Sequence, residues 1–120
     1  MNQTDISVES LIDRLKTEPD SIEFQDVVSV IATFYDYFPS GFTNGELKND
    51  AGTNEGSCKL FAFAKLHSLN ENETLSLFGD YYRIDVLQNP EGSDHQNIRN
   101  FMETGWRGVV FDGQVLTPKP

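Results

Sequence analysis

The stretch SCKLFAFAKLHSL, residues 57–69, is apolar at nearly every position from Leu60 to Leu66. A helix without a polar stripe is buried on most of its surface. A chain of 120 residues has room for one core only. We therefore expect residues 57–69 to form the most buried helix, at the centre of a single domain that spans residues 1–120.

Two amphipathic segments precede this helix. Apolar residues recur at helical spacing over residues 8–17, behind Ser7 as an N-cap, and again over residues 21–38. Asp20 and Glu23 have the spacing of a capping box at the start of the second segment. Both segments are predicted to be helices that pack an apolar face on the core.

Two further helices are predicted after the central one. Asn70 and Glu73 form another capping pair, and the apolar periodicity continues to about residue 88. Ser93 is expected to cap a shorter helix that Gly105 closes.

Two dipeptides predict hairpins. Asn44-Gly45, within residues 42–47, and Asp112-Gly113, within residues 109–116, suit the positive φ angles of a two-residue turn. The sequence thus predicts a mainly α fold of about five helices with a minor β-hairpin element, in a single compact domain.

The charge balance excludes some partners. The chain carries 19 acidic and 9 basic residues, a formal net charge of -10, and the basic residues are scattered. Binding a phosphate backbone or an anionic membrane needs clustered Lys and Arg. We expect no nucleic acid and no membrane partner, and a monomer that its net charge keeps soluble.

The cysteine count and the first residues bear on the compartment. Cys58 is the one cysteine, so it cannot form an internal disulfide, and residues 1–15 lack a basic region followed by an apolar run. We expect the protein to be made and folded in a reducing cytoplasm.

A glycine-rich loop, residues 51–59, runs directly into the central helix. It does not match a phosphate-binding loop, because Gly52 and Gly56 are one residue too close and Lys59 comes too late. Its alternative interpretation is a polar loop that ends with Ser57 as an N-cap.

The same helix start places Cys58 where the helix dipole favours a thiolate. The dipole alone shifts a thiol pKa by little more than about one unit, so a nucleophile would need a nearby imidazole. His95 follows a second Glu-Gly-Ser sequence that resembles the one before Cys58. If the two helix starts meet, Cys58 and His95 form a catalytic dyad, with Asp94, Asn97 or Asp112 to orient the ring. His67, on the apolar central helix, is expected to be a packing residue.

No metal-binding motif and no cofactor motif is present in the sequence. Candidates for contacting a ligand or a partner lie at the two helix starts and a little further along the chain. They are Asn54, Glu55, Ser57, Asn97, Arg99 and Trp106.

Three separated motifs, in order, resemble the HopJ type III effector family. They are NDAGTNEGSCKLFAFA (49–64), LFGDYYR (77–83) and NPEGSDHQNIRNFM (89–102), followed by Gly105-Trp106. The resemblance spans about residues 24–117. It implies a bacterial protein that type III secretion delivers into a host cell, with a host or bacterial protein as partner, and it implies no particular activity.

Two functional hypotheses follow. The first is a HopJ-like effector that acts by binding a protein or a ligand. The alternative is a cysteine-dependent hydrolase that uses Cys58 and His95. An enzyme needs a concave pocket that the thiol can reach, whereas a binding protein needs an exposed apolar patch.

Overall fold

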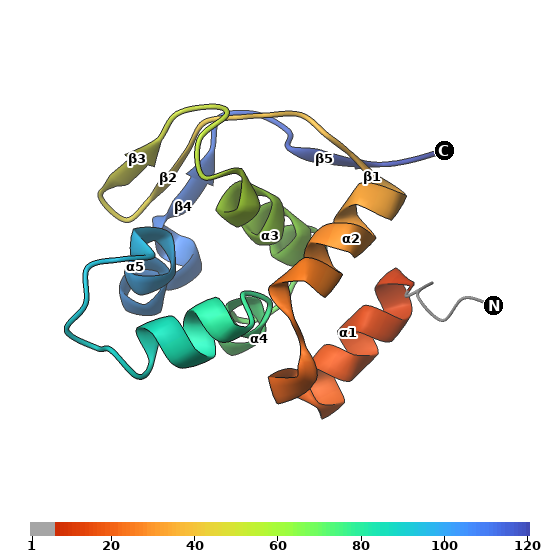
Figure 1. Ribbon diagram of the computed structural model, residues 1–120. Coiled ribbons are helices and arrows are strands. Elements are labelled where there is room, and N and C mark those ends of the chain that lie inside the picture. The colour runs from red at the N-terminus through yellow and green to blue at the C-terminus, as the bar shows by residue number, and fades with distance from the viewer. Residues whose placement is uncertain (1–6) are drawn as a thin grey trace.

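The computed structural model describes residues 7–120. The first half of the chain forms α1 (Val8–Thr17), the short 3₁₀-helix η1 (Pro19–Ser21), α2 (Phe24–Phe34) and strands β1 (Tyr35–Tyr37), β2 (Phe42–Asn44) and β3 (Leu47–Asn49). The second half forms α3 (Glu55–Leu66), α4 (Glu71–Ser76), the π-helical turn η2 (Tyr81–Val86), α5 (Gln96–Thr104), the 3₁₀-helix η3 (Gly105–Gly108), β4 (Val109–Phe111) and β5 (Leu116–Pro118). This helix-rich single domain with small antiparallel sheets confirms the predicted fold class (Figure 1).

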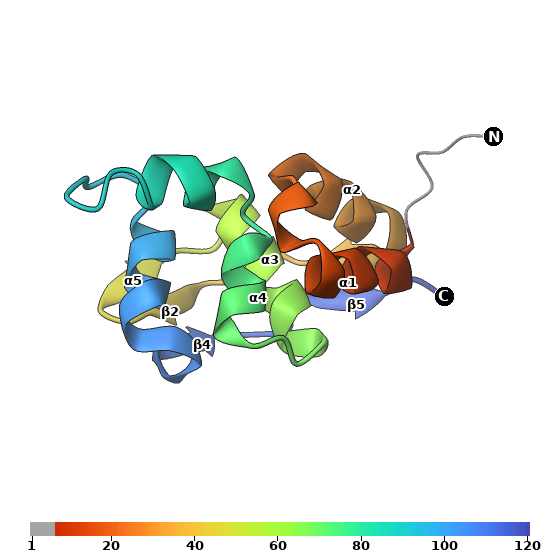
Figure 2. The same cartoon turned by 90° about the horizontal axis from the view of Figure 1, so that it is seen from below.

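The central helix is α3, which lies between α2 and α5 in both views (Figures 1 and 2). Its buried side chains are Cys58, Leu60, Phe61, Ala62, Phe63 and Ala64. The Phe61 ring contacts the rings of Phe78, in the α4–η2 connection, at 5.4 Å and of Phe101, in α5, at 5.0 Å between centroids. The prediction of a core helix here is confirmed. Within residues 7–120, no helix has the length and apolar character that a membrane span requires.

The first predicted hairpin is present, but its turn is one residue later. Strands β2 and β3 pair antiparallel with Asn44 opposite Leu47, so Gly45 and Glu46 form the turn. Gly45 has φ 65°, a conformation that glycine adopts without strain. Asn44 stays in the strand because its side chain is fully buried and hydrogen-bonded to Asn97.

The second predicted hairpin is wrong. Strand β4 pairs with β2, and β5 pairs with β1, so the two strands belong to different sheets. The Asp112 backbone N–H donates to the Gly41 carbonyl at 2.9 Å, which extends the β2–β4 ladder into the segment predicted to turn. Pairing with distant strands has replaced the local turn.

The second predicted helix is shorter than residues 21–38. Helix α2 ends at Phe34, and Tyr35–Tyr37 form β1 against Leu116–Pro118. Tyr35 is buried, with its ring edge-on to Phe63. The predicted capping box also fails, because Glu23 precedes α2 without a side-chain cap. The capping predictions at Ser7 and Asn70 are confirmed.

The helix predicted to run to residue 88 is interrupted at Gly79. Gly79 has φ 62°, and a Cβ there would lie 2.8 Å from the backbone nitrogen of Phe24. Only glycine allows this close approach, which brings the start of α2 against the α4–η2 connection. The break places Phe24 and Tyr81 beside each other, with ring centroids 5.1 Å apart.

Candidate functional site

Helices α3 and α5 begin in the same unusual way. Their N-cap residues, Asn54 and His95, both have left-handed backbone conformations, with φ 49° and 51°. Neither helix start has a side-chain cap. The predicted N-caps Ser57 and Ser93 are therefore wrong, because α3 begins before Ser57 and α5 begins after Ser93.

The first amide groups of both helices have no protein acceptor. In α3 the first backbone N–H with an intrahelical partner is that of Cys58, and in α5 it is that of Arg99. The N–H groups before these two have no hydrogen-bond partner among residues 7–120. They belong to Glu55, Gly56 and Ser57 in α3 and to Gln96, Asn97 and Ile98 in α5. Such groups carry the positive end of the helix dipole.

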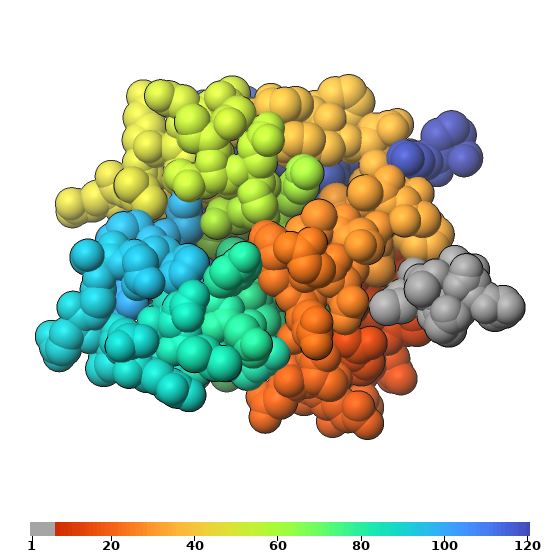
Figure 3. Space-filling view, in the orientation of Figure 1, coloured from red at the N-terminus to blue at the C-terminus, as the bar shows by residue number. Residues whose placement is uncertain are grey.

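Both helix starts line one pocket of about 420 Å³, here called the helix-start pocket. Figure 3 shows the yellow-green segment that begins α3 above and to the right of the blue segment that begins α5, on one face of the molecule. Gly56 is part of the lining, and a Cβ on it would lie 2.8 Å from the Phe24 ring, so glycine lets that ring close the pocket wall. The polar lining residues are Asn54, Ser57, His95, Gln96 and Asn97, and the apolar ones are Phe24, Leu47, Phe78, Tyr81 and Ile98.

Three buried asparagines and the exposed Asn54 hold the two helix starts in place. Asn97 of α5 and Asn49 of β3 bond reciprocally through their side chains, at 3.0 and 3.2 Å. Asn54, the N-cap of α3, donates to the same Asn49 Oδ1 at 2.6 Å, and Asn44 of β2 donates to Asn97 Oδ1 at 3.0 Å. We call Asn44, Asn49, Asn54 and Asn97 the asparagine cluster. The cluster fixes the spacing between the two helix starts, because Asn54 at the start of α3 and Asn97 at the start of α5 both bond to Asn49.

The charge around the helix-start pocket differs from that of the whole chain. None of the described residues that line it is acidic, although the chain has a net charge of -10. Three carboxylates lie near the pocket without lining it. Glu55 accepts from the Tyr37 hydroxyl at 3.2 Å, Asp94 accepts from Arg99 Nη2 at 2.6 Å, and Asp85 Oδ2 lies 3.0 Å from Nε2 of the lining residue His95. The Arg99 hydrogen bond lowers the pKa of Asp94. The pocket thus presents donors and no carboxylate of its own.

The structure does not bring Cys58 and His95 together. Cys58 is 1% exposed, and its thiol lies 3.7 Å from the Ser40 carbonyl oxygen, to which it donates. Burial raises the pKa of the thiol, and the nearby Glu55 carboxylate raises it further. No hydrogen bond joins the thiol to His95, and only His95 lines the helix-start pocket.

His95 pairs with an acid that the sequence did not single out. Its Nε2 lies 3.0 Å from Asp85 Oδ2 and 3.8 Å from Asp94 Oδ2, so Asp85 orients the ring. The ring also packs on Tyr81, with centroids 5.2 Å apart. Asp85 lies on η2, where the predicted helix offered no signal that this carboxylate faces a histidine.

Two other candidates make structural contacts. Arg99 donates to the carbonyl oxygens of Asn89 at 2.9 Å and Asp94 at 2.6 Å, which ties down the loop before α5. Trp106 donates from its indole to the Leu69 carbonyl at 3.0 Å and packs against Phe101. Neither lines the helix-start pocket.

His67 takes the packing role predicted for it. Its Nε2 lies 2.7 Å from the Tyr35 hydroxyl, and its ring packs on Phe63. Burial lowers the pKa of His67. In the part of the chain that the structure describes, no group of three or more His, Cys, Asp or Glu residues is placed to hold a metal ion.

Comparisons with known proteins identify the family. No curated protein matches the sequence. The chain is similar to a protein solved by crystallography under the description "unknown function protein VPA0580", with 50% sequence identity, a TM-score of 0.92 and 93% of each chain covered. The family model described as "HopJ type III effector protein" matches residues 8–116. This match covers nearly the whole chain, and the protein therefore belongs to the HopJ type III effector family.

Proposed function

We propose that this HopJ-family protein acts by binding, and that the helix-start pocket holds the anionic group of a small ligand. The observation that carries the proposal is the convergence of two uncapped helix starts on one pocket without an acidic lining residue. A volume of about 420 Å³ lies within the range of small-molecule sites.

The unpaired amides favour an anion for two reasons. Each helix start contributes about 0.3–2 kcal/mol through its dipole, and hydrogen bonds to a charged group contribute about 1.5–3 kcal/mol each. The net charge of -10 opposes the anion at longer range, but salt screens this repulsion beyond about 10 Å. Contacts inside the pocket are screened less, so we expect them to outweigh the distant charges.

The pocket walls indicate what the rest of the ligand is. Phe24, Phe78 and Tyr81 supply aromatic lining to the same pocket as the amides, and the Phe24 ring lies against Gly56. An apolar or aromatic body attached to the anionic group would bury its surface there. We therefore expect phenyl phosphate to bind more tightly than inorganic phosphate.

Phosphate should stabilise the wild-type protein against heat. With a Kd of about 1 mM, a phosphate concentration of about 20 mM adds roughly 1.8 kcal/mol of stability. The measurement is the Tm at fixed ionic strength, in phosphate and in chloride. Ser57→Asp should have a higher Tm without phosphate, because its carboxylate lies at the α3 start, and should lose the specific phosphate shift.

Ser57→Ala is the matched control. It keeps the backbone donors and adds no charge, so most of the phosphate shift should remain. Phosphate also stabilises proteins non-specifically, and that part of the shift should be the same in all three proteins. An equal phosphate shift in wild type and Ser57→Asp would contradict binding in this pocket.

The family name supports a cellular setting for this binding. We propose that the protein is made in the bacterial cytoplasm and delivered by type III secretion into a host cell, where it meets its partner. A fused reporter enzyme that is active only in host cytosol tests the delivery. Reporter signal should depend on an intact secretion system, and a signal that persists without that system would contradict delivery by this route.

A further inference from the structure

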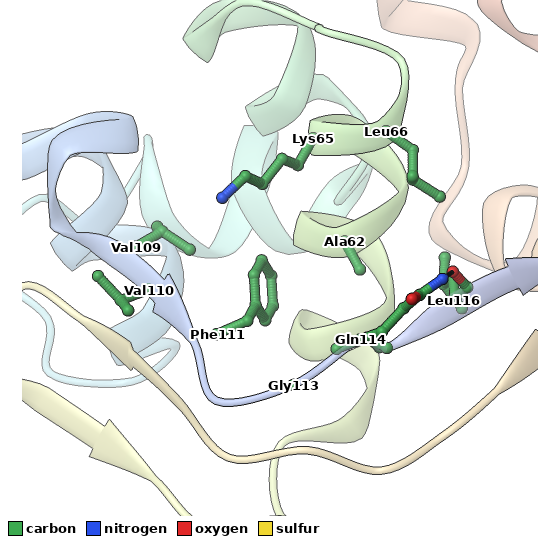
Figure 4. Close-up of a pocket in the computed structure, with 10 residues that line it drawn as sticks. Ala62, Lys65, Leu66, Val109, Val110, Phe111, Gly113, Gln114 and Leu116 are labelled. Atoms are coloured by element: carbon green, nitrogen blue, oxygen red, sulfur yellow. Dashed lines mark hydrogen bonds between the residues drawn. The ribbon is translucent and has the colours of Figure 1, made fainter.

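A second, apolar cavity lies on another part of the molecule, between β4 and α3. It has a volume of about 440 Å³. Figure 4 shows Lys65 extending from α3 toward β4 above the Phe111 ring, with Ala62 and Leu66 on the helix side. We call this cavity the β4 groove. Its lining residues are Ala62, Lys65 and Leu66 of α3, Val109, Val110 and Phe111 of β4, and Gly113, Gln114, Val115 and Leu116.

One wall of the β4 groove is an open strand edge. Gly45 N–H donates to the Gly108 carbonyl and Asp112 N–H donates to the Gly41 carbonyl, so Val110 is the residue of β4 whose backbone bonds to β2. The backbone groups of Phe111 therefore point away from β2, toward the side on which the groove lies (Figure 4). Phe111 is opposite Phe42 at a position of the ladder that exchanges no hydrogen bonds, and among residues 7–120 no turn or loop hydrogen bond reaches its N–H or its carbonyl.

The charge and exposure of the lining are also unusual for this chain. Lys65 is the one charged side chain among the described residues that line the groove, and it forms no ion pair within residues 7–120. Its Nζ lies 5.7 Å from the centre of the Phe111 ring. Leu66 is 50% exposed and Val110 is 58% exposed. An apolar surface beside a single unpaired cation complements an apolar partner that carries one carboxylate.

We propose that the β4 groove binds an extended peptide segment that adds a strand to β4, with apolar side chains in the groove and an acidic side chain opposite Lys65. Strand addition uses the free N–H and carbonyl of Phe111, which a helical partner would leave unpaired. A second copy of this chain fits less well, because pairing two β4 edges would bring two Lys65 side chains together and two chains of charge -10 into contact. This site is separate from the helix-start pocket, with which it shares no lining residue.

The test measures fluorescence anisotropy with a dye-labelled peptide, capped at both ends, of about seven residues, in which valine and threonine alternate around one central glutamate. We expect wild-type protein to bind it roughly tenfold more tightly than a peptide with lysine in place of glutamate. Lys65→Glu should reverse this preference, and Lys65→Met, which keeps the apolar stem, should remove it. Equal affinities of all three proteins for both peptides would overturn the proposal.

Two further measurements test the strand addition. Peptide binding should slow hydrogen exchange of the Phe111 amide, and a peptide N-methylated on the edge that faces β4 should bind at least roughly tenfold more weakly. An N-methylated peptide that binds as well as its parent would show that the groove takes side chains only and would overturn strand addition. A dimer that sedimentation experiments detect and that the peptide does not dissociate would overturn peptide binding at β4. It would instead favour a second copy of this chain as the occupant of the groove. Ser57→Asp should bind the peptide like wild type, so a failure here is distinguishable from a failure of the helix-start pocket.

Discussion

Phe61→Ala is expected to lower the free energy of unfolding by about 3–5 kcal/mol. Phe61 is fully buried on α3, and its ring packs against Phe42, Phe78, Phe101 and Trp106 from four other parts of the fold. Truncation removes these contacts and leaves a cavity that rigid neighbours cannot fill. Urea denaturation followed by circular dichroism measures the loss.

Phe34→Ala is the control for this prediction. Phe34 ends α2 and is 39% exposed, so the same truncation should cost well below half as much. Equal losses for Phe61→Ala and Phe34→Ala would show that α3 is not the centre of the core.

The second large effect concerns the reactivity of Cys58. We expect iodoacetamide to alkylate the folded protein at least roughly a hundredfold more slowly than the unfolded chain, because the thiol is buried and must wait for local opening. Burial also raises its pKa, which lowers the thiolate fraction at neutral pH. The measurement is the alkylation rate as a function of pH, with and without denaturant.

His95→Ala separates the binding protein from the cysteine hydrolase. In the structure His95 bonds to Asp85 and not to Cys58, so the variant should alkylate at the wild-type rate. Fast alkylation with a pKa well below about 8.5, lost in His95→Ala, would contradict this account and support the Cys58 and His95 dyad.

The helices could be predicted where local signals agree with the tertiary structure. Helix α3 (Glu55–Leu66) overlaps most of the predicted range 57–69 but begins two residues before it and ends three residues before its end. The capping residues Ser7 and Asn70 start α1 and α4 as expected. The strands at Tyr35–Tyr37 and Leu116–Pro118 could not be predicted, because each is a strand only through pairing with the other, about 80 residues away in sequence. The break at Gly79 likewise depends on the approach of Phe24, which helical periodicity does not reveal.

Only some residues of the candidate site can be singled out from the sequence, because the others depend on contacts between distant segments. The repeated Glu-Gly-Ser sequences drew attention to the two helix starts, and Asn54, Ser57, His95 and Asn97 do line one pocket. Asn44 and Asn49 were missed, because asparagine in a glycine-rich region is typical of an exposed turn. In the fold these two side chains are buried and bond to Asn97, so their role depends on partners that are distant in sequence.

The central claim is that two helix starts bind one anion, and amide chemical shifts during a phosphate titration test it most directly. We predict that the backbone N–H signals of Gly56, Ser57, Gln96 and Asn97 shift together, with one dissociation constant, because the two sets of donors face the same pocket. The Asn70 helix start, which already has a capping box, should not shift. Shifts confined to one of the two starts, or spread equally over all helix starts, would contradict the claim.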